Sequence, residues 1–298
     1  MNIVVLGAGG FLGTHICRAL TEAGDRVVTL PAGFDLVTAG PERIAAFVAG
    51  ADAVVNAAGR AWKADEPQMH TGNVELPLRV IRALALLDRR PTLVQLGSSH
   101  EYGPGTSGSG THESTEPAPV TPYGRTKLLG ARAVLDAARE GAQPGVVLRI
   151  ANVCGPGTPP GSLLGSVAGR LVRLAHDPGP TGVPAELRLP PLHAWRDFVD
   201  VRDVADAVLC TVRADGAEVA GQVINIGSGA AVHTRDLVSR LIAVSGLPVR
   251  VVEEAPAGGQ ARVDTEWQQL DVSRAAKVLG WEPRRSLDQS LRDLLAAA

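Results

Sequence analysis

Short apolar runs alternate with amphipathic helical patterns through the first half of the chain. The helical patterns cover residues 14–23, 41–49, 74–88 and 122–140, and the apolar runs lie at residues 2–6, 26–30, 51–56, 92–97 and 145–150. Strands buried on both faces are almost continuously apolar, and strands that alternate with helices form parallel sheets. The pattern therefore predicts an α/β fold with a doubly wound parallel sheet, covered by helices on both faces.

The pattern changes after residue 155. Residues 155–195 are rich in proline and glycine around one helical stretch at 163–175, which is typical of an irregular cap. Helical and strand patterns resume at residues 201–213, 222–226, 234–245, 273–279 and 286–296. We expect a Rossmann-type dinucleotide-binding domain at residues 1–155, with 196–228 returning to it, and a smaller α/β substrate-binding lobe at 156–195 and 229–298.

Composition narrows the class of protein. The chain has 298 residues, 45% of them hydrophobic and 20% charged, which indicates a globular protein. The net charge of −2 and the lack of basic runs argue against a nucleic-acid partner. No run approaches the roughly 20 apolar residues of a membrane span, and the N-terminal run lacks a signal peptide's basic flank. The three cysteines are far apart and lack metal-ligand spacing: Cys17, Cys154 and Cys210. They predict reduced thiols, no metal site and a cytoplasmic protein.

Three glycines follow the first apolar run at a spacing of three residues. Such glycines permit a tight turn, close approach of the backbone to a pyrophosphate, and close packing of helix on sheet. The N-terminus of the following helix then faces the phosphates. A glycine triplet is weak evidence alone, but its place between a strand and a helix favours a dinucleotide site. The candidate cofactor residues here are Gly7, Gly10, Phe11, Leu12 and Gly13.

The end of the second apolar run bears on the choice of coenzyme. An acid at this point binds the ribose hydroxyls of NAD, but the sequence reads Val-Val-Thr-Leu-Pro up to Pro31. Nothing repels a 2′-phosphate, so we expect NADP(H) to be favoured and NAD(H) to remain possible. Asp35, followed by Leu36, has two interpretations: it contacts the adenine edge, or it is a turn or helix-capping acid before Pro41.

Tyr123 and Lys127 lie one helical turn apart, which places both side chains on one helix face. The chain has only two tyrosines and three lysines among 29 basic residues, so both types stand out. A phenol of pKa ~10 is a poor acid–base catalyst at neutral pH, and we expect the Lys127 ammonium to lower that pKa. Ser98 and Ser99 end the fourth apolar run, where parallel-sheet enzymes place reactive groups. The low-complexity loop at 103–110 lies between these motifs and is expected to be a mobile lid.

With these motifs in place, the chain resembles the extended short-chain dehydrogenase/reductase family, in its NAD-dependent epimerase/dehydratase group acting on nucleotide sugars. The glycine loop, the Tyr123/Lys127 pair and the Arg196-Asp-Phe-Val-Asp segment carry the resemblance. Spacing from Tyr102-Gly103 makes Ser98, rather than Ser99, the match to the family's catalytic hydroxyl. The resemblance also implies further cofactor contacts, substrate contacts and a homodimer. The cofactor contacts are Ala57, Ala58, Gly59, Asn73, Tyr123, Lys127 and Ile150, and the substrate contacts are Ser98, Ser99, Asn152, Arg196 and Arg262.

Departures from the family pattern bear on the reaction. Sugar 4,6-dehydratases of the family carry Asp-Glu after the catalytic hydroxyl, whereas this chain has Ser99 and His100, which argues against a dehydratase. Epimerases that retain NAD usually keep the ribose-binding acid, which is Pro31 here. His100 has two interpretations, a loop histidine or a second acid–base group beside Ser98 and Tyr123.

The sequence therefore predicts NAD(P)H-dependent reduction of a nucleotide-linked keto-deoxysugar, most consistent with a ketone at C4. In this reading Tyr123 donates the proton, Ser98 binds the ketone oxygen, and Lys127 holds the nicotinamide ribose. Arg196, with Asn152 and Arg262, binds the diphosphate. The alternatives are a nucleotide-sugar 4-epimerase that retains NAD and a non-catalytic NAD(P)-sensing protein.

Overall fold

The computed structural model describes residues 1–61, 64–177, 184–254 and 266–298. Its main sheet has the strand order β2-β1-β3-β4-β5-β9, and every neighbouring pair in it is parallel. The strands are β1 (Asn2–Leu6), β2 (Arg26–Thr29), β3 (Ala53–Asn56), β4 (Thr92–Ser98), β5 (Gly145–Ile150) and β9 (Val223–Ile226). The predicted doubly wound parallel sheet is confirmed.

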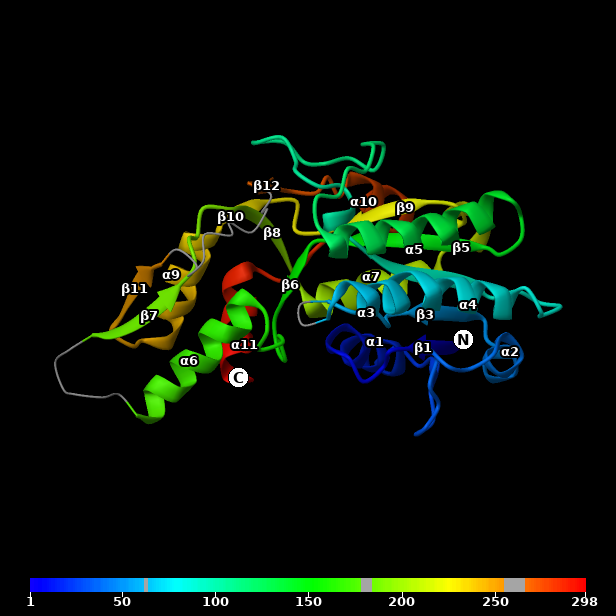
Figure 1. The fold of residues 1–298 in the computed structure, drawn as a ribbon, viewed down its shortest axis with the longest axis horizontal. Coiled ribbons are helices and arrows are strands. Elements are labelled where there is room, and N and C mark those ends of the chain that lie inside the picture. The colour runs from blue at the N-terminus through cyan, green and yellow to red at the C-terminus, as the bar shows by residue number, and fades with distance from the viewer. Residues whose placement is uncertain (62–63, 178–183, 255–265) are drawn as a thin grey trace.

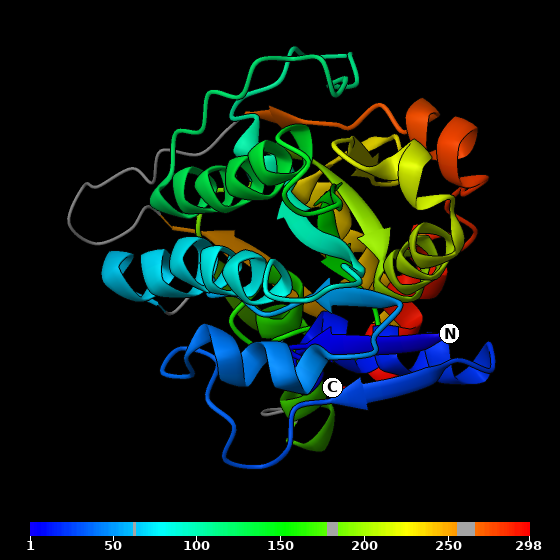
Figure 2. The same ribbon diagram turned by 90° about the vertical axis from the view of Figure 1, so that its right-hand side faces the viewer.

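Helices cover both faces of the main sheet (Figure 2). Successive residues of β1 alternate between two cores, as the two-residue period of a strand requires. Ile3 and Val5 join the core under α1 and α7, and Val4 and Leu6 join the core under the opposite helices. The first face carries α1 (Phe11–Glu22) and α7 (Val201–Arg213), and the second carries α2 (Pro41–Val48), α4 (Leu76–Leu84) and α5 (Pro122–Arg139). Shorter helices are α3 (Glu66–His70), which a π-helical turn (Thr71–Glu75) joins to α4, and α8 (Gly216–Val219).

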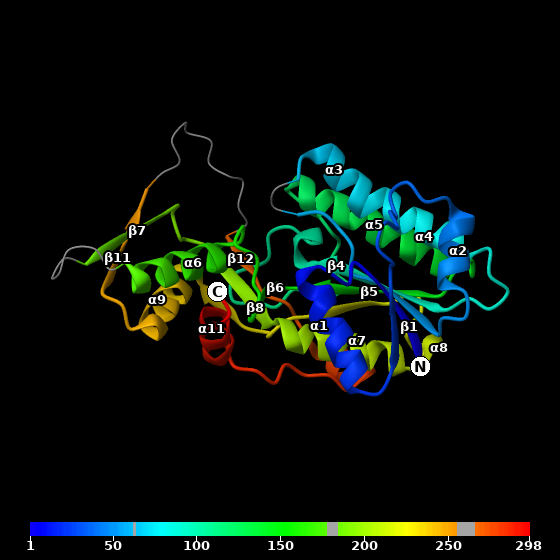
Figure 3. The same cartoon turned by 90° about the horizontal axis from the view of Figure 1, so that it is seen from below.

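The second half of the molecule projects from the carboxyl ends of the main strands (Figures 1 and 3). Its apolar core includes Leu164, Leu187, Leu237 and Leu291. Around this core lie α6 (Leu163–His176), β7 (Ala185–Leu189), α9 (Thr234–Ser245), β11 (Val249–Glu253) and α11 (Leu287–Ala296). Among the described residues, no helix combines the length and the apolar character needed to cross a membrane.

A small second sheet lies where the two halves meet. Its central strand β8 (Trp195–Asp200) pairs with β6 (Asn152–Cys154), β10 (Ala231–His233) and β12 (Trp267–Gln268). Figure 1 shows β6 and β8 between the main sheet and the smaller lobe. Because β6 follows β5 almost directly and β8 leads directly into α7, this sheet connects the carboxyl edge of the main sheet to the lobe.

One segment differs from the expected division of the chain. The sequence places all of residues 229–298 in the smaller lobe, yet α10 (Ser273–Leu279) packs against β9 and α7 of the half that contains the main sheet. Leu270, Ala275 and Trp281 belong to the core of that half, and Trp281 Nε1 donates a hydrogen bond to Asp203 O at 3.0 Å. The buried indole holds this segment on α7 before the chain returns to the lobe in α11.

The loop at 103–110 is hydrogen-bonded to the chain around β12. Gly105 N donates to Trp267 O at 2.9 Å, and Trp267 Nε1 donates to Ser109 O at 3.2 Å. Thr111 N then donates to Gln269 O at 2.7 Å. The loop that was expected to be a mobile lid is therefore hydrogen-bonded to the chain around β12, and it joins the carboxyl edge of the main sheet to the small sheet.

Candidate active site

The glycine loop between β1 and α1 packs closely against neighbouring backbone, which leaves no room for side chains at Gly7 and Gly13. Gly7 has φ +80°, and a Cβ there would lie 2.6 Å from Ala58 N. A Cβ at Gly13 would lie 2.1 Å from Gly7 O. Gly10 caps α1 without a side chain, and the first turn of α1 carries no acidic residue. The free amide groups of this turn and the lack of Cβ atoms suit a pyrophosphate, so the residues present fit a dinucleotide.

The segment after β3 lies directly against that loop. Asn56, buried in β3, accepts a hydrogen bond from Ala58 N at 3.2 Å and donates to Gln95 Oε1 at 2.8 Å. Asn73 bonds both backbone groups of Arg60 at 2.9 Å. It also donates to Thr126 Oγ1 in α5 at 3.1 Å. The expected cofactor residue Asn73 is thus fully engaged by the protein, and it acts by fixing the segment that includes Ala57, Ala58 and Gly59.

Pro31 follows the end of β2, beside the start of the glycine loop, because Val5 of β1 is in register with Thr29. Asp35 is exposed, and its carboxylate accepts from Val37 N at 2.9 Å and Thr38 Oγ1 at 3.2 Å. Its turn-capping interpretation therefore has a structural basis, and its neighbour Leu36 is buried in the core.

A cation that sequence reasoning missed lies near this turn. The Arg43 guanidinium is 4.7 Å from the centre of the Phe34 ring, and Phe34 N donates to Pro31 O at 3.1 Å. The ring fixes the guanidinium above the turn that follows β2. Arg43 lies twelve residues after Pro31 in the sequence, so local sequence pattern does not indicate that it approaches the turn that follows β2.

Ser98 and Tyr123 meet at the carboxyl edge of the main sheet. Ser98 is the last residue of β4, and Tyr123 lies in the first turn of α5, where Thr121 Oγ1 caps the helix. Their side chains are hydrogen-bonded to each other. Ser99 is buried, and its hydroxyl has no hydrogen-bond partner among the described residues. The geometry thus selects Ser98, as the spacing predicts, as the hydroxyl paired with Tyr123.

Burial, rather than Lys127, dominates the ionisation of Tyr123. Burial raises the pKa of Tyr123 to about 12, although the hydrogen bond with Ser98 opposes this shift. Lys127 is 8% exposed and donates from Nζ to Leu96 O of β4. Burial lowers the pKa of Lys127, and the negative charge of Glu101 partly opposes that shift. The expected lowering of the Tyr123 pKa by Lys127 is therefore not found, because the ammonium is directed to a backbone carbonyl.

His100 lies beside the phenol. Its ring centre is 5.7 Å from that of Tyr123, with the ring planes at 72°. His100 N donates to Ser98 Oγ at 3.3 Å, so the same short turn positions the imidazole and the serine. The structure thus brings together Ser98, His100, Tyr123 and Lys127.

The expected substrate residues lie on the small sheet beyond this cluster. Asn152 Nδ2 in β6 donates to Asp197 O in β8 at 3.1 Å, and the neighbouring Arg196 is 6% exposed. Ile150 is buried at the end of β5, two residues before Asn152 in the chain. Arg262, the other expected diphosphate ligand, lies outside the described residues.

Sequence reasoning missed two buried acids that organise these elements. Asp197 accepts hydrogen bonds from Ser228 N and Oγ at 2.7 Å and from Leu270 N at 3.2 Å. Glu101, with no exposed surface, binds Arg149 and the backbone of Ser98. The signal available in the sequence is Arg149 itself, a charge in an otherwise apolar strand that needs a buried partner.

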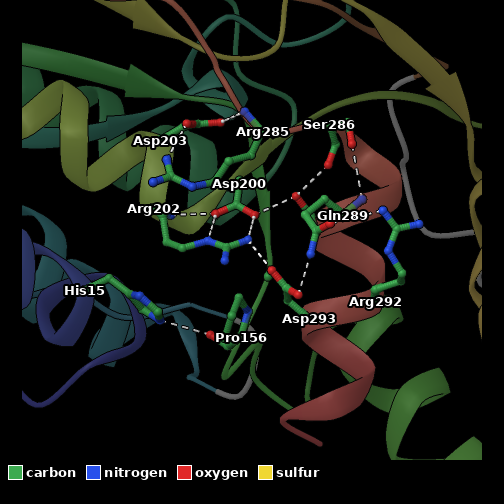
Figure 4. Close-up of polar contacts among 12 residues, drawn as sticks. His15, Pro156, Asp200, Arg202, Asp203, Arg285, Ser286, Gln289, Arg292 and Asp293 are labelled. Carbon is green, nitrogen blue, oxygen red and sulfur yellow. Dashed lines mark hydrogen bonds and ion pairs between the residues drawn. The ribbon is translucent and has the colours of Figure 1, made fainter.

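A polar network joins α7 to the C-terminal helix of the lobe (Figure 4). Asp200 binds the Arg202 guanidinium through both carboxylate oxygens at 2.8 Å and accepts from Ser290 Oγ at 2.6 Å. Arg202 also pairs with Asp293 at 2.7 Å. Figure 4 shows His15 of α1 on the side of Arg202 that faces away from α11. His15 Nε2 is 3.0 Å from Pro156 O. These contacts hold the lobe against the cofactor half.

A family model described as NAD dependent epimerase/dehydratase family matches residues 3–227. The chain belongs to this family. The predicted resemblance is confirmed, and membership of the epimerase/dehydratase family makes NAD(P) the cofactor that the glycine loop accommodates.

The chain is also similar to individual members of the epimerase/dehydratase family. It is 42% identical to the dTDP-6-deoxy-L-talose 4-dehydrogenase (NAD(P)(+)) of Kitasatospora kifunensis, with 99% of this chain and 95% of that protein covered. It is 27% identical to the UDP-glucose 4-epimerase of Azospirillum brasilense, with 99% and 91% covered. The solved structure of RMD from Pseudomonas aeruginosa complexed with NADPH has a TM-score of 0.86 at 25% identity, with 99% and 98% covered.

Proposed function

We propose that this protein is an NAD(P)H-dependent 4-ketoreductase of a nucleotide-linked 4-keto-6-deoxyhexose, with a dTDP-linked sugar as the first candidate substrate. The observation that carries the proposal is the hydrogen-bonded Ser98–Tyr123 pair, with Lys127 one helical turn along. The 42% identity to a dTDP-6-deoxy-L-talose 4-dehydrogenase supports chemistry at C4 of a deoxysugar. Reduction of the 4-ketone and oxidation of the 4-alcohol are the two directions of one reaction.

When bound, the reduced nicotinamide supplies a hydride to the ketone carbon. Tyr123 holds the proton that the ketone oxygen takes up, and its raised pKa keeps that proton in place at neutral pH. Ser98 orients the oxygen against the phenol, and Lys127 binds the ribose. Arg196 and Asn152 contact the diphosphate, so that binding energy far from the reacting carbon fixes the geometry.

We infer that NADP(H) is the favoured coenzyme. Three features support this preference: Pro31 supplies no negative charge after β2, Asp35 is engaged in its own turn, and the Arg43 guanidinium lies over the Phe34 ring. A 2′-phosphate on the adenosine ribose would meet a cation there and no carboxylate from position 31.

The direct test is a scan of dTDP- and UDP-linked 4-keto-6-deoxysugars with NADPH and NADH, followed by the absorbance of the reduced nicotinamide. The proposal expects coenzyme consumption that matches the formation of a 4-alcohol, and Tyr123→Phe is the inactive control. No coenzyme consumption with any 4-ketosugar would refute it.

The 4-epimerase alternative is supported by the 27% identity to a UDP-glucose 4-epimerase across almost the whole chain. An epimerase would be purified with NAD bound and would interconvert sugars without net coenzyme consumption.

The homodimer implied by the family resemblance remains a prediction, which light scattering of the purified protein tests.

A further inference from the structure

Glu101 is a fully buried carboxylate next to the catalytic serine. Its Oε1 accepts a hydrogen bond from Ser98 N at 2.8 Å, and its Oε2 accepts one from Arg149 Nε at 2.7 Å. The short helical turn Ser99–Glu101 brings the carboxylate back to the strand end, while Ser98 Oγ caps the same turn. One acid therefore fixes the backbone of the residue whose hydroxyl pairs with Tyr123.

The sequence leaves a specific space for this carboxylate. Gly97 in β4 has no side chain, and a Cβ there would lie 2.7 Å from Glu101 Oε1. Arg149 is 3% exposed, and its guanidinium carbon is 4.2 Å from the centre of the Tyr102 ring. Tyr102 OH in turn donates to Asn225 Oδ1 at 2.8 Å. Glycine, arginine and tyrosine thus enclose one negative charge and hold it in a single position.

This charge acts on both members of the Tyr123–Lys127 pair. Buried charges interact more strongly than exposed ones because water does not screen them. Besides the larger effect of burial, Glu101 raises the pKa of Tyr123. It also raises the pKa of Lys127, against the lowering that burial causes. Among the residues that the structure describes, Ser98 and His100 also face Tyr123, and the carbonyl of Leu96 faces Lys127.

We propose that Glu101, together with Arg149, is a positioning residue of the catalytic site, which fixes the backbone of Ser98 and faces the Tyr123–Lys127 pair with a buried negative charge. In the reduction direction the phenol must carry a proton and the lysine must be an ammonium, and a nearby negative charge favours both forms. The catalytic part of this inference rests on the proposed reductase function, whereas its electrostatic part concerns this chain alone.

The electrostatic part is tested by NMR of lysine labelled with ¹³C at Cε. The chain has three lysines, and loss of one signal in Lys127→Arg assigns Lys127. We expect Glu101→Gln, which preserves the shape of the side chain, to move the titration of Lys127 to lower pH by about one unit or more. An unchanged titration would overturn the proposal, whatever reaction the enzyme catalyses.

The catalytic part is tested with the 4-ketosugar substrate. We expect Glu101→Gln to lower kcat by roughly 10- to 100-fold, with little change in NADPH affinity, since the lost interaction lies under the reacting groups. The alkaline limb of the kcat profile should move to lower pH. A purely structural role would instead lower kcat equally at all pH values.

Glu113→Gln is the matched control. Glu113 is also buried, accepts from Asn225 N at 3.0 Å and lies 3.6 Å from Arg274 Nε, but it does not contact Ser98. We expect this variant to lose stability and to keep both the Lys127 titration and the pH profile. The same shifts in Glu113→Gln would mean that the effect is not specific to Glu101.

A second variant covers the case in which Glu101→Gln does not fold. The double variant Glu101→Gln/Arg149→Met removes both charges, and such replacements of a buried pair are often well tolerated. We expect it to fold, with the Lys127 titration still at lower pH and kcat still reduced. Recovery of wild-type kcat together with stability would show that the pair is only structural.

Discussion

The ring of His100 meets the ring of Tyr123 edge to face, with the centroids 5.7 Å apart and the planes at 72°. The imidazole therefore lies directly against the phenol that the proposed mechanism uses as its proton donor. A single ketone reduction needs one proton donor, and in the proposed mechanism Tyr123 has that role. The contact is compatible with two roles for His100. Its ring orients the phenol, or it is a second acid–base group.

We expect His100→Phe to keep kcat within about tenfold of the wild type, because phenylalanine preserves the edge-to-face contact, whereas loss of an acid–base group costs roughly 10²–10⁴-fold. The measurement is kcat against pH for both proteins. A loss above 10²-fold, with one limb of the pH profile removed, would make His100 the second acid–base group.

Tyr123→Phe should lower kcat by roughly 10²–10⁴-fold, the usual contribution of a general acid, and leave NADPH affinity nearly unchanged. Burial raises the Tyr123 pKa to about 12, so the wild-type phenol stays protonated through the neutral range. We therefore expect wild-type reduction not to be limited by Tyr123 ionisation near pH 7, and to lose activity only on the alkaline side. Near-full turnover by Tyr123→Phe would remove this residue from the mechanism.

Pro31→Asp should change the coenzyme preference. A carboxylate at the end of β2 would repel a 2′-phosphate by about a few kcal/mol at an effective dielectric near 20, before screening reduces it. We expect kcat/KM for NADPH to fall at least tenfold while that for NADH is kept or improved. If the wild type strongly prefers NADH and Pro31→Asp has the same coenzyme preference, the NAD-retaining epimerase becomes the favoured function.

Arg43→Gln should weaken binding of adenosine 2′,5′-bisphosphate and leave binding of 5′-AMP unchanged, because only the former carries a phosphate at the ribose 2′ position. Calorimetry of these two ligands needs no sugar substrate. The exposed Arg89, which pairs with Asp52 at 2.8 Å, provides the control Arg89→Gln. Equal losses for both ligands would place the 2′-phosphate away from Arg43.

Asp200→Asn should lower the free energy of unfolding at pH 7 by about 1–3 kcal/mol, because the partly buried Arg202 loses its bidentate partner and keeps only Asp293. Burial opposes ionisation, but hydrogen bonds from Arg202 and Ser290 hold the pKa of Asp200 below its usual value. Its contribution to stability is therefore present above the unfolded pKa of about 3.9 and is lost as pH falls through the folded pKa.

The difference between wild type and Asp200→Asn should consequently shrink below about pH 4, which urea unfolding at several pH values measures. Asp288→Asn is the control on α11, the helix that carries Ser290 and Asp293, since Asp288 and Arg240 form an exposed pair 3.5 Å apart. That variant should change stability by less than about 1 kcal/mol. A pH-independent difference for Asp200→Asn would contradict the ionic role of this carboxylate.

The sequence by itself determined the sheet and the reactive edge. Alternation of apolar strands with amphipathic helices specifies a parallel sheet, because both its faces must be covered. In a parallel sheet all strands end at one edge, so the residues that follow each strand are brought together whatever their separation in sequence. Gly7 and Ser98 could therefore be assigned to one edge from local pattern, whereas Tyr123, at the start of a helix, was added by its four-residue spacing to Lys127.

The tertiary structure decided what depends on contacts between distant segments. The Glu101–Arg149 pair, Arg43 over Phe34 and the return of Trp281 to α7 join residues that share no local pattern. The ionisation of Tyr123 was misjudged for the same reason. A spacing of four residues places Lys127 on the right helix face, but burial and the position of Leu96 O set the pKa of the phenol and the direction of the ammonium. Helical period fixes which side chains share a face, whereas their electrostatics depend on every element packed around them.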